Sequence, residues 1–193
     1  MLTNTVRIIG GKWRGKKLSF PSIAGLRPTP DRIRETAFNW IQFEVSGARV
    51  LDLFAGSGAF GFEALSRGAA YAVFVEKDTS AVAQLNNHCQ EMNIENALIE
   101  PCDALQFLKQ TVSQAAGQPA FDIVFLDPPY GKHLLEPCMN DLEQQHLLTD
   151  KAFIYLETES SLTLPPLPCN WRLTRSKHSG QVSYYLAVRE TDR

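Results

Sequence analysis

Asp127, Pro128, Pro129 and Tyr130 combine groups that can hold a planar amine. They follow the apolar run 121–126, which is typical of a buried strand in a parallel sheet. Because proline has no N–H and a fixed φ, the chain leaves this strand stiffly, with free carbonyl acceptors. The Asp127 carboxylate and these carbonyls can accept both hydrogens of an NH2 group, and the Tyr130 ring can stack on a base. The pattern indicates chemistry at an exocyclic amine, although a turn after a strand would explain Pro-Pro alone.

A glycine-rich segment predicts a nucleotide-like cofactor. The strand 49–54 leads into residues 55–61, where small side chains let a ligand approach the backbone before a helix begins. A further strand, 71–75, ends at Glu76, which is placed to accept hydrogen bonds from two ribose hydroxyls. The dinucleotide pattern G-x-G-x-x-G is matched at Gly56, Gly58 and Gly61. NAD is therefore one possible cofactor.

Two further acids bear on the choice of cofactor. Asp52 precedes the glycines, where a carboxylate would repel a pyrophosphate but attract the ammonium group of a methionine moiety. This favours S-adenosylmethionine, although Asp52 can also bind a turn or a helix terminus. A dehydrogenase also has no evident use for the motif at 127–130, at the carboxyl end of its strand. Asp103 can accept from an adenine amine or cap a helix that begins at Ala104.

These motifs together resemble a class I S-adenosylmethionine-dependent methyltransferase that acts on an exocyclic amine. The segments 7–18 (RIIGGKWRGKKL) and 26–40 (LRPTPDRIRETAFNW) are similar to the RsmD family of bacterial small-subunit ribosomal RNA methyltransferases, which modify the N2 amine of a guanine. The similarity covers nearly the whole chain. At Tyr130 the family commonly has Phe, and either ring can stack. At Asp103 family members can carry an amide.

The resemblance implies an α/β, Rossmann-like class I methyltransferase fold with a mostly parallel seven-stranded sheet, an antiparallel closing hairpin and a small amino-terminal β-hairpin. Residues 1–28 would form a basic hairpin and arm that contacts RNA, and residues 29–193 the S-adenosylmethionine-dependent methyltransferase domain. The segment 27–32 would close over the cofactor. The predicted catalytic residues are Asp127, Pro128, Pro129 and Tyr130. The predicted cofactor-binding residues are Thr29, Arg32, Asp52, Phe54, Gly56, Gly58, Glu76, Lys77, Asp103 and Ala104.

The charge of the amino-terminal segment indicates a polyanionic partner. Residues 1–34 carry eight Lys and Arg side chains against Asp31 alone, a net charge of +7, whereas the whole chain carries −2 and the remainder therefore −9. Residues 6–18 predict a hairpin that turns at Gly10 and Gly11 and presents cations on one face. Trp13 is expected to cover apolar surface rather than to stack on a base. The predicted RNA-binding residues are Arg7, Lys12, Arg14, Lys16 and Lys17. The alternative is a solvated basic arm without a partner.

Two other patterns predict secondary structure. Thr29 and Pro30 are typical of the cap and first turn of a helix. Its apolar side chains, at Ile33, Ala37 and Ile41, would face the sheet. The opposite face is expected to carry Arg32 and Arg34. Residues 171–178 and 182–189 predict an antiparallel pair that a simple NAD-binding sheet would not need.

Composition agrees with one compact cytoplasmic domain. The chain has 193 residues and 44% hydrophobic content, enough to bury a large core. Its four cysteines show no spacing typical of zinc or of a disulfide framework, so we expect a reducing compartment and no metal. No apolar run approaches the roughly 20 residues that cross a bilayer, so we expect no membrane contact. A monomer is expected.

We expect direct methyl transfer to an unpaired or flipped base in a structured RNA loop, with small-subunit ribosomal RNA as the partner, free or within the assembled 30S subunit. A DNA or other RNA amine methyltransferase of the N6-adenine type is an alternative, although 193 residues leave no room for a separate target-recognition domain. Protein-glutamine methyltransferases resemble this chain but carry Asn where Asp127 stands. A non-catalytic RNA-binding module would not need Asp127 and Tyr130.

Overall fold

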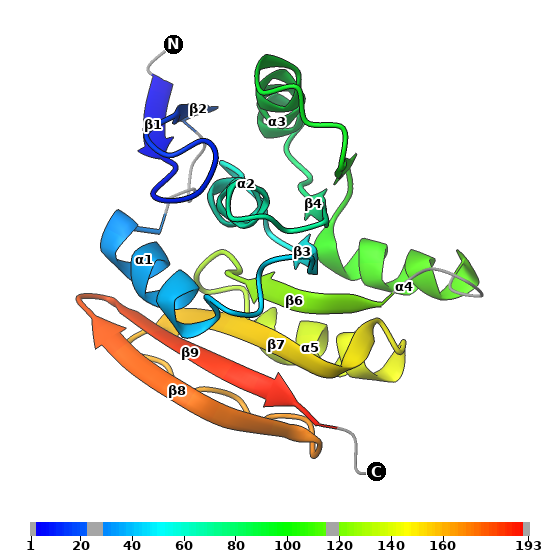
Figure 1. Cartoon of the computed structure of the whole chain (residues 1–193). Coiled ribbons are helices and arrows are strands. Elements are labelled where there is room, and N and C mark those ends of the chain that lie inside the picture. The colour runs from blue at the N-terminus through cyan, green and yellow to red at the C-terminus, as the bar shows by residue number, and fades with distance from the viewer. Residues whose placement is uncertain (1–2, 23–28, 115–119, 191–193) are drawn as a thin grey trace.

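The computed structural model describes residues 3–22, 29–114 and 120–190 (Figure 1). A seven-stranded sheet forms the centre of the fold. The strand order is β5-β4-β3-β6-β7-β9-β8. Five neighbouring strands are parallel, namely β3 (Arg49–Asp52), β4 (Tyr71–Val75), β5 (Ala97–Glu100), β6 (Phe121–Leu126) and β7 (Leu148–Glu159). β9 (Val182–Arg189) is antiparallel to both β7 and β8 (Trp171–Ser179). The predicted fold class and the closing antiparallel pair are confirmed.

Helices cover both faces of the sheet. Alternate strand residues point to opposite faces, so the strands have apolar side chains to bury on each side. In β3, Val50 packs in one buried cluster and Leu51 in the other. The cluster that contains Val50 includes side chains of α1 (Asp31–Trp40), α2 (Ala59–Ser66) and α3 (Thr79–Glu91). The cluster that contains Leu51 includes side chains of α4 (Ala104–Gln114) and α5 (Leu135–Gln144).

The strand order places a crevice between β3 and β6. After β3 the chain crosses through α2 to β4 on one side, and after β6 it crosses through α5 to β7 on the other. Loops that leave two adjacent parallel strands in opposite directions open a space at the carboxyl ends of those strands. The predicted glycine-rich loop and the motif at 127–130 both lie at this position.

The amino-terminal hairpin packs on the same core as the sheet. β1 (Thr3–Arg7) pairs antiparallel with β2 (Lys17–Pro21), which confirms the hairpin. The predicted turn at Gly10 and Gly11 is wrong, because residues 8–16 form a long connection that lies against α2. Consequently Lys12, Arg14 and Lys16 lie in this connection and not on one face of a strand. The hairpin side chains buried in the core are Val6, Ile8, Leu18 and Phe20.

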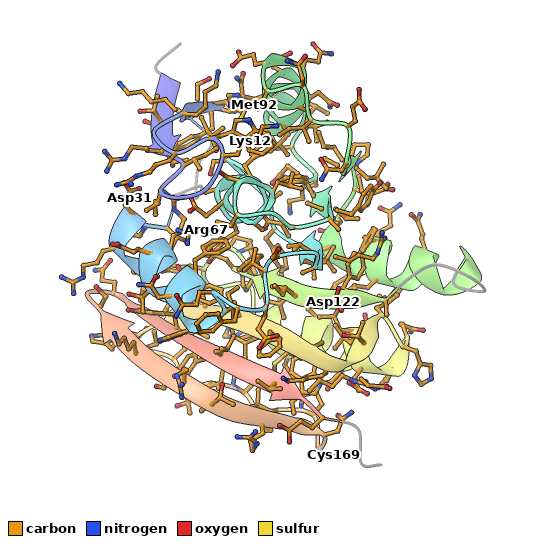
Figure 2. The ribbon with its side chains drawn as sticks, in the orientation of Figure 1. Lys12, Asp31, Arg67, Met92, Asp122 and Cys169 are labelled. Atoms are coloured by element: carbon orange, nitrogen blue, oxygen red, sulfur yellow. The ribbon has the colours of Figure 1, made fainter. Side chains whose placement is uncertain are left out.

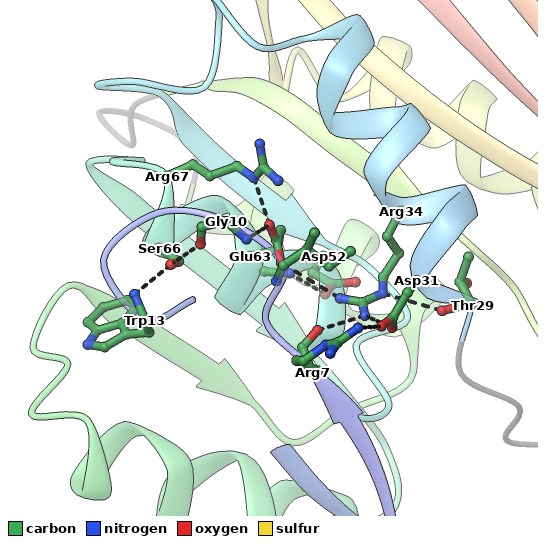
Figure 3. Close-up of polar contacts among 12 residues, drawn as sticks. Arg7, Gly10, Trp13, Thr29, Asp31, Arg34, Asp52, Glu63, Ser66 and Arg67 are labelled. Atoms are coloured by element: carbon green, nitrogen blue, oxygen red, sulfur yellow. Dashed lines mark hydrogen bonds and ion pairs between the residues drawn. The ribbon is translucent and has the colours of Figure 1, made fainter. Parts of the chain in front are cut away.

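Helix α2 holds the hairpin connection through its polar side chains (Figure 3). The Glu63 carboxylate accepts from the backbone N–H of Ile9 at 2.6 Å and of Gly10 at 2.8 Å. Ser66 accepts from Trp13 N–H at 2.9 Å through its hydroxyl, and from Lys12 N–H at 2.7 Å through its carbonyl. Trp13 also packs against the core, which confirms its predicted apolar role.

Gly11 permits this close approach to α2. Its φ is +75°, and a Cβ there would lie 1.8 Å from the carbonyl oxygen of Ser66. Nearby, the Arg67 guanidinium donates to Glu63 at 2.7 Å and lies 5.0 Å from the ring centre of Phe38 in α1 (Figure 2). The hairpin, α1 and α2 therefore share one packed junction.

Helix α1 differs from its prediction at three positions. Pro30 is the residue before the first turn, and Thr29 is not a cap, because its hydroxyl points to the carboxyl groups of the crevice. Arg34 is fully buried rather than on the outer face. Its guanidinium donates to the Arg7 carbonyl at 2.8 Å and to Asp31 at 2.6 Å, partners that make its burial tolerable. The predicted buried positions, Ile33, Ala37 and Ile41, are confirmed.

The predicted boundary between residues 28 and 29 adjoins the segment 23–28, which lies outside the described residues. Arg27, part of the segment predicted to close over the cofactor, also falls there. Among the helices described, none is long and apolar enough to cross a membrane.

Candidate active site

A cavity of about 390 Å³ opens at the carboxyl ends of the parallel strands. It is lined by the loops that follow β3, β4, β5 and β6, together with Thr29 and Glu157. The predicted site residues that line it are Thr29, Phe54, Gly56, Glu76, Lys77, Asp103, Ala104, Asp127, Pro128, Pro129 and Tyr130. The fold therefore brings together residues from five separate segments, including the whole motif predicted to bind an amine.

Glu76 follows β4 and supports the glycine-rich loop. Its carboxylate accepts from the N–H of Gly56 and from the N–H of Asp78, each at 2.8 Å. A carboxylate offers about four lone-pair sites, so Glu76 retains acceptors for ligand hydroxyls while it holds the loop. This geometry suits the predicted contact with ribose.

Asp103 lies at the start of α4. Its carboxylate accepts from the Leu105 N–H at 3.0 Å and lies 3.8 Å from the Lys77 ammonium. The helix-capping interpretation of Asp103 is thus present in the structure. Its second interpretation, a contact to an adenine amine, stays a prediction.

Asp52 lies beneath the loop and not in the cavity lining. Its carboxylate accepts from the N–H of Gly61, in the first turn of α2, at 3.0 Å. Burial raises the pKa of Asp52 to about 7; the Gly61 N–H opposes this shift, and the charges of Asp127 and Glu76 add to it. The turn-binding role weighed from the sequence is present here, and the contact to a methionine ammonium stays a prediction.

Two other predicted cofactor residues also do not line the cavity, namely Gly58 and Arg32. Gly58 has φ +74°, and a Cβ there would lie 2.5 Å from the Phe62 ring. It therefore serves the packing of the loop onto α2. Arg32 is exposed on α1.

Asp127 follows β6 and faces a second carboxyl group, that of Glu157, near the end of β7. The Thr29 hydroxyl donates to Asp127 at 2.9 Å. Burial raises the pKa of Asp127 to about 6, and hydrogen bonds to Thr29 and to Glu157 oppose this shift. Burial also raises the pKa of Glu157 to about 9, with the Asp127 charge adding to the shift. At neutral pH these directions leave Asp127 ionised and Glu157 protonated.

A smaller cavity of about 160 Å³ lies across the wall formed by Pro128, Pro129 and Tyr130. Glu157 contributes to both cavities. On this side Glu159 accepts from the Gly131 N–H at 2.8 Å, which ties the loop after β6 to β7. Tyr130 is 44% exposed, so its ring is accessible between the two cavities.

Sequence reasoning missed Glu157. It is an acid near the end of an apolar strand, the same signal that singled out Asp127 and Glu76. In residues 152–157, part of the strand next to β6, the same signal identifies Glu157.

The donor set of the larger cavity fits S-adenosylmethionine. Its lining carries five carboxyl groups, from Glu76, Asp78, Asp103, Asp127 and Glu157, and one cation, Lys77. Such a lining favours a cationic ligand with several hydroxyl and amine donors over a pyrophosphate. S-adenosylmethionine has a sulfonium, an ammonium group, ribose hydroxyls and an adenine amine. The charge of this cavity therefore disfavours NAD, whose pyrophosphate is anionic.

The predicted RNA-binding side chains lie together on and beside the hairpin. Lys12, Arg14 and Lys17 are exposed, and the Lys12 ammonium lies 5.0 Å from the Trp13 ring centre (Figure 2). Lys16 pairs with Glu91 at 2.9 Å, and Arg7 pairs with Asp31 at 3.1 Å. Exposed ion pairs are weak, so these two cations remain available to exchange partners.

Comparison with known proteins places the chain in a family. The model of a family described as "Conserved hypothetical protein 95" matches residues 6–188. A relative from Escherichia coli K12, named "Ribosomal RNA small subunit methyltransferase D", is 48% identical over 185 residues, which cover 96% of this chain and 90% of the relative. The chain belongs to the RsmD family.

Other members of the RsmD family support the same assignment. A relative of the same name from Haemophilus influenzae is 44% identical and covers 94% of this chain and 92% of its own length. A solved structure, described as the putative methyltransferase yhhF from Escherichia coli, has a TM-score of 0.86 at 44% identity and covers 97% of this chain and 99% of that one. The similarity therefore extends across the fold and includes every site segment described above.

Proposed function

We propose that the protein transfers a methyl group from S-adenosylmethionine to the exocyclic N2 amine of a guanine in small-subunit ribosomal RNA. The observation that carries this proposal is the shared cavity, in which the acceptor motif Asp127 to Tyr130 adjoins the glycine-rich loop and Glu76. The names of the relatives support ribosomal RNA as the substrate.

When bound, S-adenosylmethionine supplies an electrophilic methyl group. The protein contributes alignment. Asp127 accepts one amine hydrogen, the Pro128 carbonyl accepts the other, and Tyr130 stacks on the base, so that the nitrogen lone pair is turned toward the methyl donor. Glu76 holds the ribose, and the acidic lining attracts the cationic ligand.

The hairpin supplies the electrostatic contact to RNA. Its four cations, Lys12, Arg14, Lys16 and Lys17, are called the hairpin cations below. Because these side chains lie outside the cavity, they suit phosphates of the RNA backbone rather than the target base. Residues 1–28 would thus be the RNA-contacting part, and the substrate would be a loop of the RNA, free or in the assembled 30S subunit. We propose that the protein acts in the cytoplasm as a monomer.

A panel of substrates tests this proposal. Purified protein and S-adenosylmethionine with a labelled methyl group are incubated with naked small-subunit ribosomal RNA, assembled small subunits or DNA, with Asp127→Ala as the matched inactive control. We expect label in RNA, either naked or assembled, and none with the variant. Label only in DNA would favour the DNA amine methyltransferase, and label in no polymer would favour a non-catalytic RNA-binding module.

A further inference from the structure

One buried hydroxyl, that of Thr29, lies between the two carboxyl groups of the active-site cavity. Its Oγ1 is 2.9 Å from Asp127 Oδ2 and 3.3 Å from Glu157 Oε2. The hydroxyl of Tyr155 donates to the same Glu157 oxygen at 2.8 Å. Thr29, Tyr155 and Glu157 are all buried, so these groups must largely satisfy one another.

The number of hydrogens available in this cluster determines whether both carboxyl groups can be ionised. Thr29 has a single O–H hydrogen, so it can donate to only one of the two carboxyl groups. If both were ionised, the other carboxylate would face the lone pairs of the Thr29 oxygen. One proton on Glu157 removes this conflict, because Glu157 then donates to Thr29 and Thr29 donates to Asp127. The result is an ordered chain that runs from Tyr155 through Glu157 to an ionised Asp127, by way of Thr29 or by the direct Glu157–Asp127 contact.

The charged groups around Asp127 and Glu157 also favour a single proton shared by the two carboxyl groups. Asp52, the last residue of β3, interacts electrostatically with Asp127 and with Glu76, which follows β4. Tyr184 in β9 interacts in the same way with Tyr155. One buried cation, Arg34, donates to the carbonyl of Thr29 at 3.3 Å, and it also donates to the Arg7 carbonyl and to Asp31 (Figure 3).

Neither carboxyl of the pair forms an ion pair within residues 3–22, 29–114 and 120–190. Two adjacent carboxyl groups, Glu157 buried and Asp127 half-buried, cannot both ionise readily without a cation, because desolvation and mutual repulsion act together. The raised pKa values of Asp127 and Glu157 agree with this arrangement.

We propose that Glu157 is a positioning residue that holds one proton at neutral pH and, through Thr29, keeps the Asp127 carboxylate ionised and oriented toward the substrate amine. This inference rests on the proposed function, since Asp127 is the amine acceptor. The fixed Thr29 donor occupies one lone pair of Asp127 Oδ2, which leaves the others for the amine. When Glu157 loses its proton at alkaline pH, a second negative charge disturbs this orientation.

Conservative substitutions separate this role from a merely structural one. We expect Glu157→Ala and Thr29→Val each to lower the single-turnover methylation rate by about 10-fold or more, the effect of losing a hydrogen bond that serves a charged group. Thr29→Ser restores the donor and should recover most of the rate. Glu157→Gln, with its amide nitrogen in the position of Oε2, can donate one hydrogen to Thr29 and the other to the Tyr155 oxygen, so it should recover most of the rate lost in Glu157→Ala.

The pH profile is the deciding readout. We expect the wild-type rate to decline at alkaline pH, as Glu157 ionises, and the rate of Glu157→Gln to show no such decline. Infrared difference spectroscopy, which needs no RNA, should show a protonated carboxyl group at neutral pH in wild type that is lost in Glu157→Gln.

Two results would overturn the inference: an alkaline decline unchanged in Glu157→Gln, or the absence of any protonated-carboxyl signal at neutral pH that is lost in Glu157→Gln. If Glu157→Ala does not fold, Thr29→Val carries the same test, and calorimetric cofactor binding reports folding in each variant. Failure of the proposed function would give a different result from failure of this inference. The wild-type protein would then show the infrared signal but would methylate no RNA.

Discussion

Gly11→Ala should detach the hairpin from α2 without removing any charge. A Cβ at Gly11 would lie 1.8 Å from the Ser66 carbonyl oxygen, so the connection has to move away from α2. Gly15 is the matched control, because its φ of +87° resembles the +75° of Gly11 and nothing lies within 4 Å of its added Cβ.

The expected destabilisation follows from these geometries. Both substitutions place alanine in the left-handed region, which costs about 1–2 kcal/mol. Gly11→Ala additionally disrupts the hydrogen bonds from Lys12 N–H and Trp13 N–H to Ser66, each of which contributes about 0.5–1.5 kcal/mol. We therefore expect Gly11→Ala to lower the free energy of unfolding by about 1–3 kcal/mol more than Gly15→Ala does.

Urea denaturation measures this difference, and RNA titration measures its functional consequence. We expect Gly11→Ala to weaken RNA binding, because the hairpin cations lose their fixed position, while calorimetric cofactor affinity stays near that of wild type. Equal destabilisation by the two substitutions would refute the role of the Gly11 contact. Unchanged RNA affinity in a clearly destabilised Gly11→Ala would refute the role of the docked hairpin in RNA binding.

Three further predictions concern charged groups. Asp127→Ala should abolish methylation with little change in cofactor affinity, whereas Glu76→Ala should weaken cofactor binding by roughly 1.5–3 kcal/mol. If calorimetry shows that Asp127→Ala weakens cofactor binding more than Glu76→Ala does, the two roles are exchanged. Replacing the hairpin cations with Ala should lower the log-log salt slope of RNA binding by up to about 0.7–0.9 per lost phosphate contact, and an unchanged slope would leave only a solvated arm. The folded-state pKa of Glu157 is raised from 4.5 to about 9, so its contribution to stability is complete below pH 4.5 and is lost as pH rises toward 9. The free energy of unfolding of wild type should therefore fall relative to that of Glu157→Gln across this window, by up to about 1.4 kcal/mol per pH unit, and parallel pH curves for the two proteins would contradict the shift.

Local patterns in the sequence predicted the sheet and most of the cavity. Apolar strands that end in an acid identified Glu76, Asp103 and Asp127, because the carboxyl ends of parallel strands meet at one edge. This reasoning requires only the direction of the strands.

The errors have a common physical origin in contacts between distant segments. Thr29 has the side chain of a helix cap, but its hydroxyl lies between the carboxyl groups of Asp127 and Glu157. Arg34 is buried because Arg7 and Asp31 supply acceptors that its helical position alone does not reveal. Two adjacent glycines suggested a tight turn, whereas Gly11 instead permits contact with Ser66. Such partners become visible only once the hairpin is placed against α1 and α2.

The identity of the methylated nucleoside tests the central claim most directly. RNA methylated by the purified protein is digested to nucleosides, and the labelled product is identified by mass spectrometry against synthetic standards. The account predicts N2-methylguanosine as the labelled nucleoside, absent when Asp127→Ala replaces wild type. N6-methyladenosine, or label confined to DNA or protein, would contradict the claim that this cavity presents the exocyclic amine of an RNA guanine.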